Sequence, residues 1–136
     1  MSRLLRLATI LVVEDEDLLR RLTTRILELG GYRLLEAANG GEALMLSQDY
    51  DGGIDLLLTD VVMPRMSGRQ LAEHLAPLRP DMKVLYTSGY TDNAIVHQGV
   101  LDEGTPFIQK PFSASNLLNK VWEVLGGSGG NASTGS

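Results

Sequence analysis

A single carboxylate, that of Asp60, ends an unbroken apolar stretch and is the first candidate for chemistry. Residues 54–59 before it show no sustained alternation of polar and apolar side chains, which is typical of a strand buried on both faces. Pro64 and Gly68 follow in a short loop. Open α/β sheets bind ligands at the carboxyl ends of their strands, so Asp60 is a candidate site residue. An ordinary role as a turn residue remains the alternative.

Other polar side chains follow apolar stretches in the same way. They are Glu14 and Asp15 after residues 8–13, Ser88 after residues 82–87, and Lys110 after residues 105–109. Neighbouring strands lie about 4.8 Å apart, so these side chains would converge on one crevice. Clustered carboxylates repel one another when ionised. Mg²⁺ relieves that repulsion, since it binds carboxylate oxygens together with waters and phosphate oxygens.

Such a site would suit the transfer of a phosphoryl group onto a carboxylate. Asp60 would attack in line, and because a carboxylate is ionised at neutral pH it needs no general base. Mg²⁺, Lys110 and loop amides would stabilise charge on the equatorial oxygens, and Ser88 would supply a hydroxyl donor. We interpret His74 and His97 as surface or packing residues.

The segments between these residues form five strand–helix units. The expected strands are Ala8–Val13, Arg33–Ala37, Ile54–Thr59, Met82–Thr87 and Thr105–Gln109. The expected helices run from an Asp17 cap to Gly30, over Glu42–Gln48 after an Asn39-Gly40-Gly41 turn, from a Ser67 cap to Pro77 and Pro80, over Asp92–Gln98, and from a Ser113 cap to Leu125. Short connections indicate parallel pairing with right-handed crossovers. We expect an α/β, flavodoxin-like (βα)5 three-layer sandwich with a parallel five-stranded sheet of order 2-1-3-4-5.

The helical spacing of apolar residues also predicts which side of each helix faces the core. In the first helix these residues are Leu18, Leu19, Leu22, Ile26 and Leu29. In the third they are Leu71, Leu75 and Leu78, and in the last Leu117, Val121 and Val124 or Leu125.

The composition of the 136-residue chain suits one globular domain, placed at residues 7–125. Residues 126–136 contain only Gly, Ser, Asn, Ala and Thr, and we expect a disordered tail or a cloning remnant. The chain has no cysteine, which excludes disulfides and thiolate metal sites and fits a cytoplasmic protein. A net charge of −5 argues against nucleic acid or a membrane surface as partner.

Four segments together resemble the receiver domain of two-component response regulators. They are Val12–Glu16, Leu58–Gly68, Leu85–Gly89 and Phe107–Phe112. Each is weak alone, but all four in this order and at this spacing are specific, and the similarity runs from about Leu7 to Leu125. Gly89–Asp92 with Lys110–Phe112 also looks like the C-terminal receivers of hybrid sensor histidine kinases.

The resemblance implies that Asp60 is the phosphoacceptor. The donor would be a phosphohistidine on a sensor histidine kinase or a histidine phosphotransfer domain. Asp15, Asp60 and the Val62 carbonyl would ligate Mg²⁺, with Glu14 acting partly through water. Lys110 would pair with Asp60 or with the phosphate.

The resemblance also implies a conformational switch. Ser88 matches the switch hydroxyl, with Thr87 as its rival and capping of the next turn as the structural alternative. Phe107 matches the switch aromatic; without the hydroxyl of a tyrosine it would act by repacking, and an ordinary core role is its alternative. The Lys110–Pro111 bond matches a position that is cis in the family. The surface expected to change comprises the fourth helix, the fifth strand and the fifth helix.

Other functions remain open at this point. The alternative reading is a non-phosphorylated pseudo-receiver that acts as a protein-interaction module, although the full acid set with Lys110 speaks against it. A flavodoxin-like electron carrier would need a phosphate-binding loop where this chain has the acids Glu14–Asp17. A hydrolase with an aspartyl intermediate would need an inserted cap. We expect a phosphoacceptor signalling domain rather than an enzyme, from a parent chain that could be a hybrid histidine kinase, with a homodimer also open.

Overall fold

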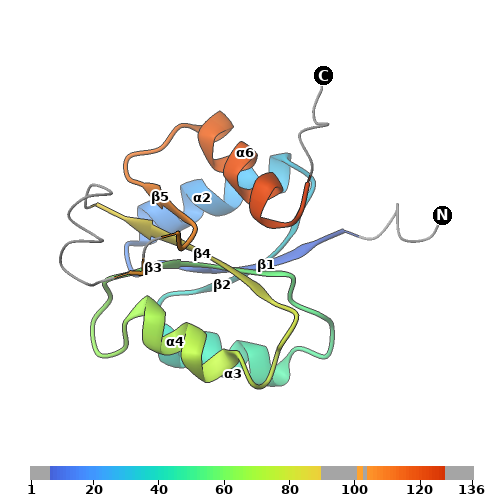
Figure 1. Cartoon of the computed structure of the whole chain (residues 1–136), viewed down its shortest axis with the longest axis vertical. Helices are drawn as coiled ribbons and strands as arrows, with labels where there is room; N and C mark the ends of the chain where they lie inside the picture. Colours follow the sequence, from blue (N-terminus) through green and yellow to red (C-terminus); the bar gives the residue numbers. More distant parts are fainter. Residues whose placement is uncertain (1–6, 90–100, 103, 128–136) are drawn as a thin grey trace.

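The computed structural model describes residues 7–89, 101–102 and 104–127, and in this part of the chain a parallel five-stranded sheet forms the centre (Figure 1). Its strands are β1 (Thr9–Val13), β2 (Arg33–Ala37), β3 (Leu56–Asp60), β4 (Lys83–Ser88) and β5 (Phe107–Gln109). They lie in the order β2-β1-β3-β4-β5, which confirms the predicted topology. The helix predicted at Asp92–Gln98, with His97, lies outside the described residues.

Four described helices cover the two faces of the sheet. They are α2 (Asp17–Leu29), α3 (Gly40–Asp49), α4 (Gly68–Leu75) and α6 (Ala114–Val124). Figure 1 shows α2 and α6 on one face and α3 and α4 on the other, which is the predicted three-layer arrangement. None of the described helices has the length and apolar character needed to cross a membrane.

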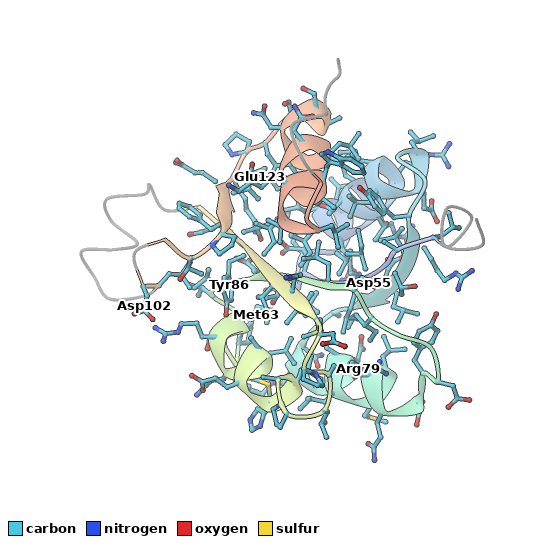
Figure 2. The ribbon with its side chains drawn as sticks, turned by 45° about the vertical axis from the view of Figure 1, so that its right-hand side comes forward. Asp55, Met63, Arg79, Tyr86, Asp102 and Glu123 are labelled. Carbon is cyan, nitrogen blue, oxygen red and sulfur yellow. The ribbon has the colours of Figure 1, made fainter. Side chains whose placement is uncertain are left out.

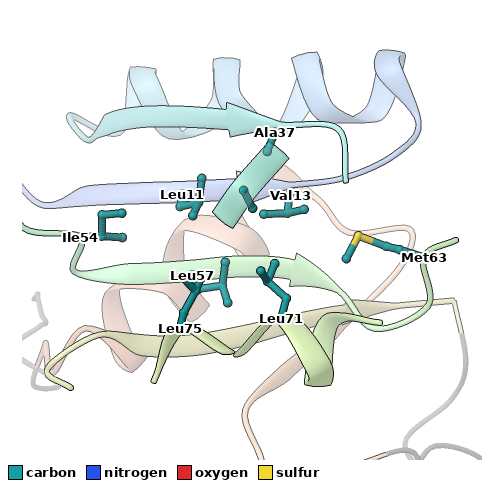
Figure 3. Close-up of a cluster of buried hydrophobic side chains, with 9 residues drawn as sticks. Leu11, Val13, Ala37, Ile54, Leu57, Met63, Leu71 and Leu75 are labelled. Carbon is teal, nitrogen blue, oxygen red and sulfur yellow. The ribbon is translucent and has the colours of Figure 1, made fainter. Parts of the chain in front are cut away.

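The strands β1 and β3 are buried along their whole length because helices pack on both faces. Leu11, Val13 and Leu57 point to the α3–α4 side, where they meet Leu71 and Leu75 (Figure 3). Successive side chains of a strand alternate between faces. Their neighbours therefore form a second core cluster with α2 and α6, made of Ile10, Val12, Leu56, Leu58, Leu27, Leu117 and others. Burial of each such side chain stabilises the fold by roughly 1.5–3 kcal/mol.

Side-chain caps fix where three of the helices begin. The hydroxyls of Ser67 and Ser113 accept the backbone N–H groups of Gln70 and Asn116, as predicted. Asn39 caps α3 by accepting the N–H of Glu42, so the predicted turn at residues 39–41 continues directly into the helix. The predicted cap residue of α2, Asp17, was wrong by one position. Glu16 occupies the cap position without a side-chain cap bond, and Asp17 is the first helical residue.

The predicted inward face of α2 was wrong in part. Leu18, Leu22 and Leu29 are 76%, 53% and 74% exposed. The buried positions are Thr23, Thr24 and Leu27. The hydroxyl of Thr24 donates to the Arg21 carbonyl, and this local bond satisfies the polar group inside the core.

Smaller corrections concern the ends of other elements. Leu78 is 69% exposed because α4 already ends at Leu75, whereas Leu71 and Leu75 are buried as predicted. The strands β3 and β4 each begin and end one or two residues later than predicted. The fifth strand begins at Phe107 rather than Thr105; Pro106 has no N–H for a ladder. In α6, Leu117 and Val121 are buried as predicted.

Candidate functional site

Three carboxylates meet at the carboxyl edge of the sheet. Val13 pairs with Thr59, and Asp60 with Thr87, so the ends of β1, β3 and β4 lie at the same level. One carboxylate oxygen from each of Glu14, Asp15 and Asp60 lies within 4.8 Å of the other two. The structure therefore brings together the acids that the sequence placed at separate strand ends.

Lys110 joins two of these acids. Its Nζ atom lies 2.9 Å from Oε1 of Glu14 and 2.9 Å from Oδ2 of Asp60. The side chains of Lys110, Glu14 and Asp60 are only 20%, 7% and 12% exposed. Solvent therefore screens these pairs less than it screens a surface salt bridge.

Burial and pairing shift the ionisation of this group. Burial raises the pKa of Glu14 above its ordinary value, and the hydrogen bond from Lys110 limits the rise. Burial alone would lower the pKa of Lys110, but its hydrogen bonds to Asp60 and Glu14 outweigh that effect and raise it. Lys110 therefore stays protonated, and its positive charge favours the ionised form of the carboxylates that it contacts.

The backbone around Glu14 is tied to its surroundings. Its N–H donates to the Ala37 carbonyl at 3.2 Å, and its Oε2 accepts the N–H of Glu16 at 3.0 Å. Its carbonyl accepts a hydrogen bond from Arg20 at 2.8 Å. Sequence reasoning missed Arg20. The signal for it was a basic residue one helical turn into α2, where its side chain can fold back on the loop of residues 14–16, the acidic loop.

The loop after Asp60 packs directly on the strand. The Gly68 N–H donates to the Val61 carbonyl at 2.9 Å, and a Cβ atom at Gly68 would lie 2.2 Å from the Asp60 carbonyl oxygen. Only a glycine allows that approach. Arg65 takes a positive φ of 70°, which tightens the turn. Val62, whose carbonyl is expected to ligate a metal, lies in this loop and is 56% exposed.

The two predicted switch residues lie on neighbouring strands. Ser88 is the last residue of β4 and is 1% exposed, and its carbonyl accepts the Lys110 N–H at 2.7 Å. Phe107 begins β5 and packs against the cluster of Val61, Tyr86 and Leu101. These positions are compatible with the expected roles of Ser88 and Phe107 but leave the roles themselves as predictions.

Two further observations concern residues at the edge of the site or away from it. The Lys110–Pro111 bond is cis, as the resemblance implied. His74 lies in the last turn of α4 with an exposed side chain, in agreement with its interpretation as a surface residue.

The donor set of this site fits a hard divalent cation. Three carboxylates lie together, and the ammonium of Lys110 contacts two of them, Glu14 and Asp60. Asp15 is exposed, whereas the other two acids are nearly buried. Mg²⁺ favours such carboxylate oxygens and keeps several waters. Asp15 leaves the cluster accessible to solvent on one side.

A sequence model of the response regulator receiver domain matches residues 10–122. The chain belongs to this family. Receiver domains are signalling domains of two-component systems, and the curated relatives of this receiver include a sensor kinase and a response regulator. It is 41% identical over 118 residues to the sensor kinase CckA of Brucella abortus, a match that covers 87% of this chain and 12% of the relative. It is 32% identical over 116 residues to the response regulator receiver protein CpdR of the same organism, covering 85% of this chain and 95% of the relative.

Solved structures show the same fold. The receiver domain of the hybrid histidine kinase CckA matches with a TM-score of 0.73 and 36% identity, over 87% of this chain and 99% of the other. The chemotaxis protein CheY4 of Vibrio cholerae matches with a TM-score of 0.76 and 26% identity, over 88% and 99%. The receiver spans only 12% of the CckA relative and 31% of a related cyclic di-GMP phosphodiesterase from Thermotoga maritima.

Proposed function

We propose that this receiver accepts a phosphoryl group on Asp60 from a phosphohistidine, in a reaction that depends on Mg²⁺. The observation that carries the proposal is the ammonium of Lys110 between Asp60 and Glu14, at 2.9 Å from each. It places a fixed positive charge beside a carboxylate nucleophile, where a transferred phosphoryl group would carry its negative charge.

In the proposed reaction, a carboxylate oxygen of Asp60 attacks phosphorus. Oδ2 accepts the hydrogen bond from Lys110, so we assign Oδ1 as the attacking atom. A P–O bond forms as the P–N bond of the phosphohistidine breaks, and the electron pair of that bond stays on the imidazole nitrogen. Lys110 then remains close to the oxygens of the new acyl phosphate.

We propose that Asp15, Asp60 and the Val62 carbonyl hold the Mg²⁺ ion, with Glu14 acting partly through water. When bound, the ion supplies positive charge to the phosphoryl oxygens. The protein side chains position the reacting groups. Asp15 is the exposed member of the acid cluster, so it offers the ion its first contact from solvent.

For the partner, we propose a sensor histidine kinase or a histidine phosphotransfer domain that docks on α2. The outward side of α2 carries Leu18 and Leu22, both more than half exposed. This pair starts three residues after Asp15, so it is close in the chain to the acid cluster. Exposed apolar groups close to a reactive centre favour a protein partner with an apolar surface. The similarity to CckA supports a hybrid kinase as the parent chain.

For the response to phosphorylation, we propose a repacking that starts at Ser88. Its hydroxyl would bind the phosphoryl group, and Phe107 would repack against Tyr86 and Leu101. The surface that changes would then include β5 and α6. Since Phe107 has no hydroxyl, packing rather than a hydrogen bond from the ring would carry the signal.

Intact-mass spectrometry after incubation with Mg²⁺ and acetyl phosphate tests the proposal. We expect one added phosphoryl group on the wild-type domain and none on Asp60→Asn or in the presence of excess chelator. Unchanged labelling of Asp60→Asn would overturn the assignment of the nucleophile. Failure of the wild-type domain to bind Mg²⁺ at millimolar concentration would favour a pseudo-receiver.

A further inference from the structure

Arg20 ties the acidic loop to two other segments. Its side chain is 15% exposed, which is low for an arginine near a helix start. Nη1 donates to the Glu14 carbonyl at 2.8 Å, and Nη2 to Oδ1 of Asp17 at 2.7 Å. Nε lies 3.7 Å from Oε1 of Glu36 on β2. One guanidinium group therefore connects the loop after β1, the first turn of α2 and a neighbouring strand.

The bond to the Glu14 carbonyl has the largest consequence for the site. That carbonyl belongs to the peptide that joins Glu14 to Asp15, so holding it fixes the point from which the Asp15 side chain starts. The contact with Asp17 is different, since the Asp17 side chain is 79% exposed and exposed pairs of this kind contribute little.

We propose that Arg20 is a positioning residue for the divalent cation site. Its guanidinium holds the Glu14–Asp15 peptide so that the Asp15 carboxylate stays beside those of Glu14 and Asp60. Arg20 touches neither the ion nor the reacting atoms. This inference rests on the proposed function, because it assigns Arg20 a role in the Mg²⁺ site used there.

A positioning role and a purely electrostatic role of Arg20 predict different effects of its substitution on Mg²⁺ affinity. A positive charge near three carboxylates disfavours a cation, so electrostatics alone predicts that Arg20→Gln binds Mg²⁺ more tightly and Arg20→Lys binds as the wild type does. Positioning predicts that both variants bind more weakly. Lysine keeps the charge but lacks the planar fork that reaches several acceptors at once.

The test is isothermal titration of the full chain with Mg²⁺, with thermal unfolding measured on the same samples. We expect the dissociation constants of Arg20→Lys and Arg20→Gln to rise roughly tenfold, in the range seen when groups that orient metal ligands are removed. Unchanged or tighter binding in both variants would overturn the inference, whatever happens to their melting temperatures.

Arg79 provides a matched control at the opposite end of the sheet, close to the start of β4 (Figure 2). Its guanidinium donates to the Ser47 hydroxyl at 2.7 Å and to the carbonyls of Ser47, Tyr50 and Gly52 at 2.8–2.9 Å. We expect Arg79→Lys to lower the melting temperature and leave Mg²⁺ affinity unchanged. A similar loss of affinity in Arg79→Lys would mean that Arg20 acts only through stability. A wild-type domain that binds no Mg²⁺ would overturn the proposed function as well.

Discussion

The ammonium of Lys110 and the carboxylate of Asp60, fifty residues apart in the chain, meet at 2.9 Å. The same Nζ atom contacts Glu14 at an equal distance. One cation thus balances two nearly buried acids at the edge where β1, β3 and β5 end. Lys110 therefore contributes both to the stability of this edge of the sheet and to its chemistry.

Replacing Lys110 by methionine should separate those two contributions. The metal-free variant leaves Glu14 and Asp60 without their cation. We expect a loss of about 1–3 kcal/mol in unfolding free energy at neutral pH, below the cost of breaking a fully buried pair because the site is partly exposed. Urea denaturation in chelator measures this loss.

The same variant should bind Mg²⁺ at least as tightly as the wild type, because the competing ammonium is gone. Labelling by acetyl phosphate should nevertheless slow by about a hundredfold, as expected when one group that stabilises transition-state charge is removed. Rapid labelling of Lys110→Met would show that the ammonium has no part in transfer.

The raised pKa of Glu14 predicts a pH dependence in the metal-free protein. Burial raises this pKa above the ordinary value of 4.5, so folding favours the protonated acid. The contribution of Glu14 to stability is therefore greatest below pH 4.5 and is lost as the pH rises through the folded pKa. Relative to wild type, Glu14→Gln should be more stable at pH 7 than at pH 4.5. Denaturant titrations in chelator at both values give the comparison, and a difference of the opposite sign would contradict the assigned burial effect.

Gly68 is the residue that lets the loop pack on Asp60. The methyl group of Gly68→Ala would lie 2.2 Å from the Asp60 carbonyl oxygen, so the loop or the strand end must move. We expect a loss of about 1–3 kcal/mol in stability together with slower labelling of Asp60. Gly41→Ala is the control, because its methyl group would make only an ordinary contact, 3.4 Å from Oδ1 of the α3 cap residue Asn39. Equal effects of the two substitutions would argue against the close approach.

The fold and the convergence of the acids could be predicted because they follow from one rule. Leu57 and its neighbours form runs without alternation, which indicates strands covered on both faces. Parallel strands then bring residues at their carboxyl ends, such as Asp15 and Asp60, to one edge whatever their separation in the chain. Strand order was the only further information needed.

The inward face of α2 could not be predicted in the same way. Apolar residues occur on more than one side of this helix, so periodicity alone does not select among Leu18, Leu22 and Leu27. Contacts with α6 and the sheet select Leu27 together with Thr23, whose polarity argued against burial. The role of Arg20 was not predicted either, because its acceptor at Glu14 is a backbone carbonyl rather than a side chain.

The exposed leucines of α2 lead to the last prediction. Replacing Leu18 and Leu22 together by alanine should leave stability within about 0.5 kcal/mol, because both side chains are largely in solvent. Labelling by acetyl phosphate should also be unchanged. Transfer from a phosphorylated histidine phosphotransfer protein that labels the wild type should slow at least tenfold, the effect of losing apolar anchors at a docking surface. Leu78→Ala is the matched control, since Leu78 is 69% exposed but follows α4 on the other face of the sheet. If transfer slows equally in the control, or is unaffected in the double variant, α2 is not the docking surface.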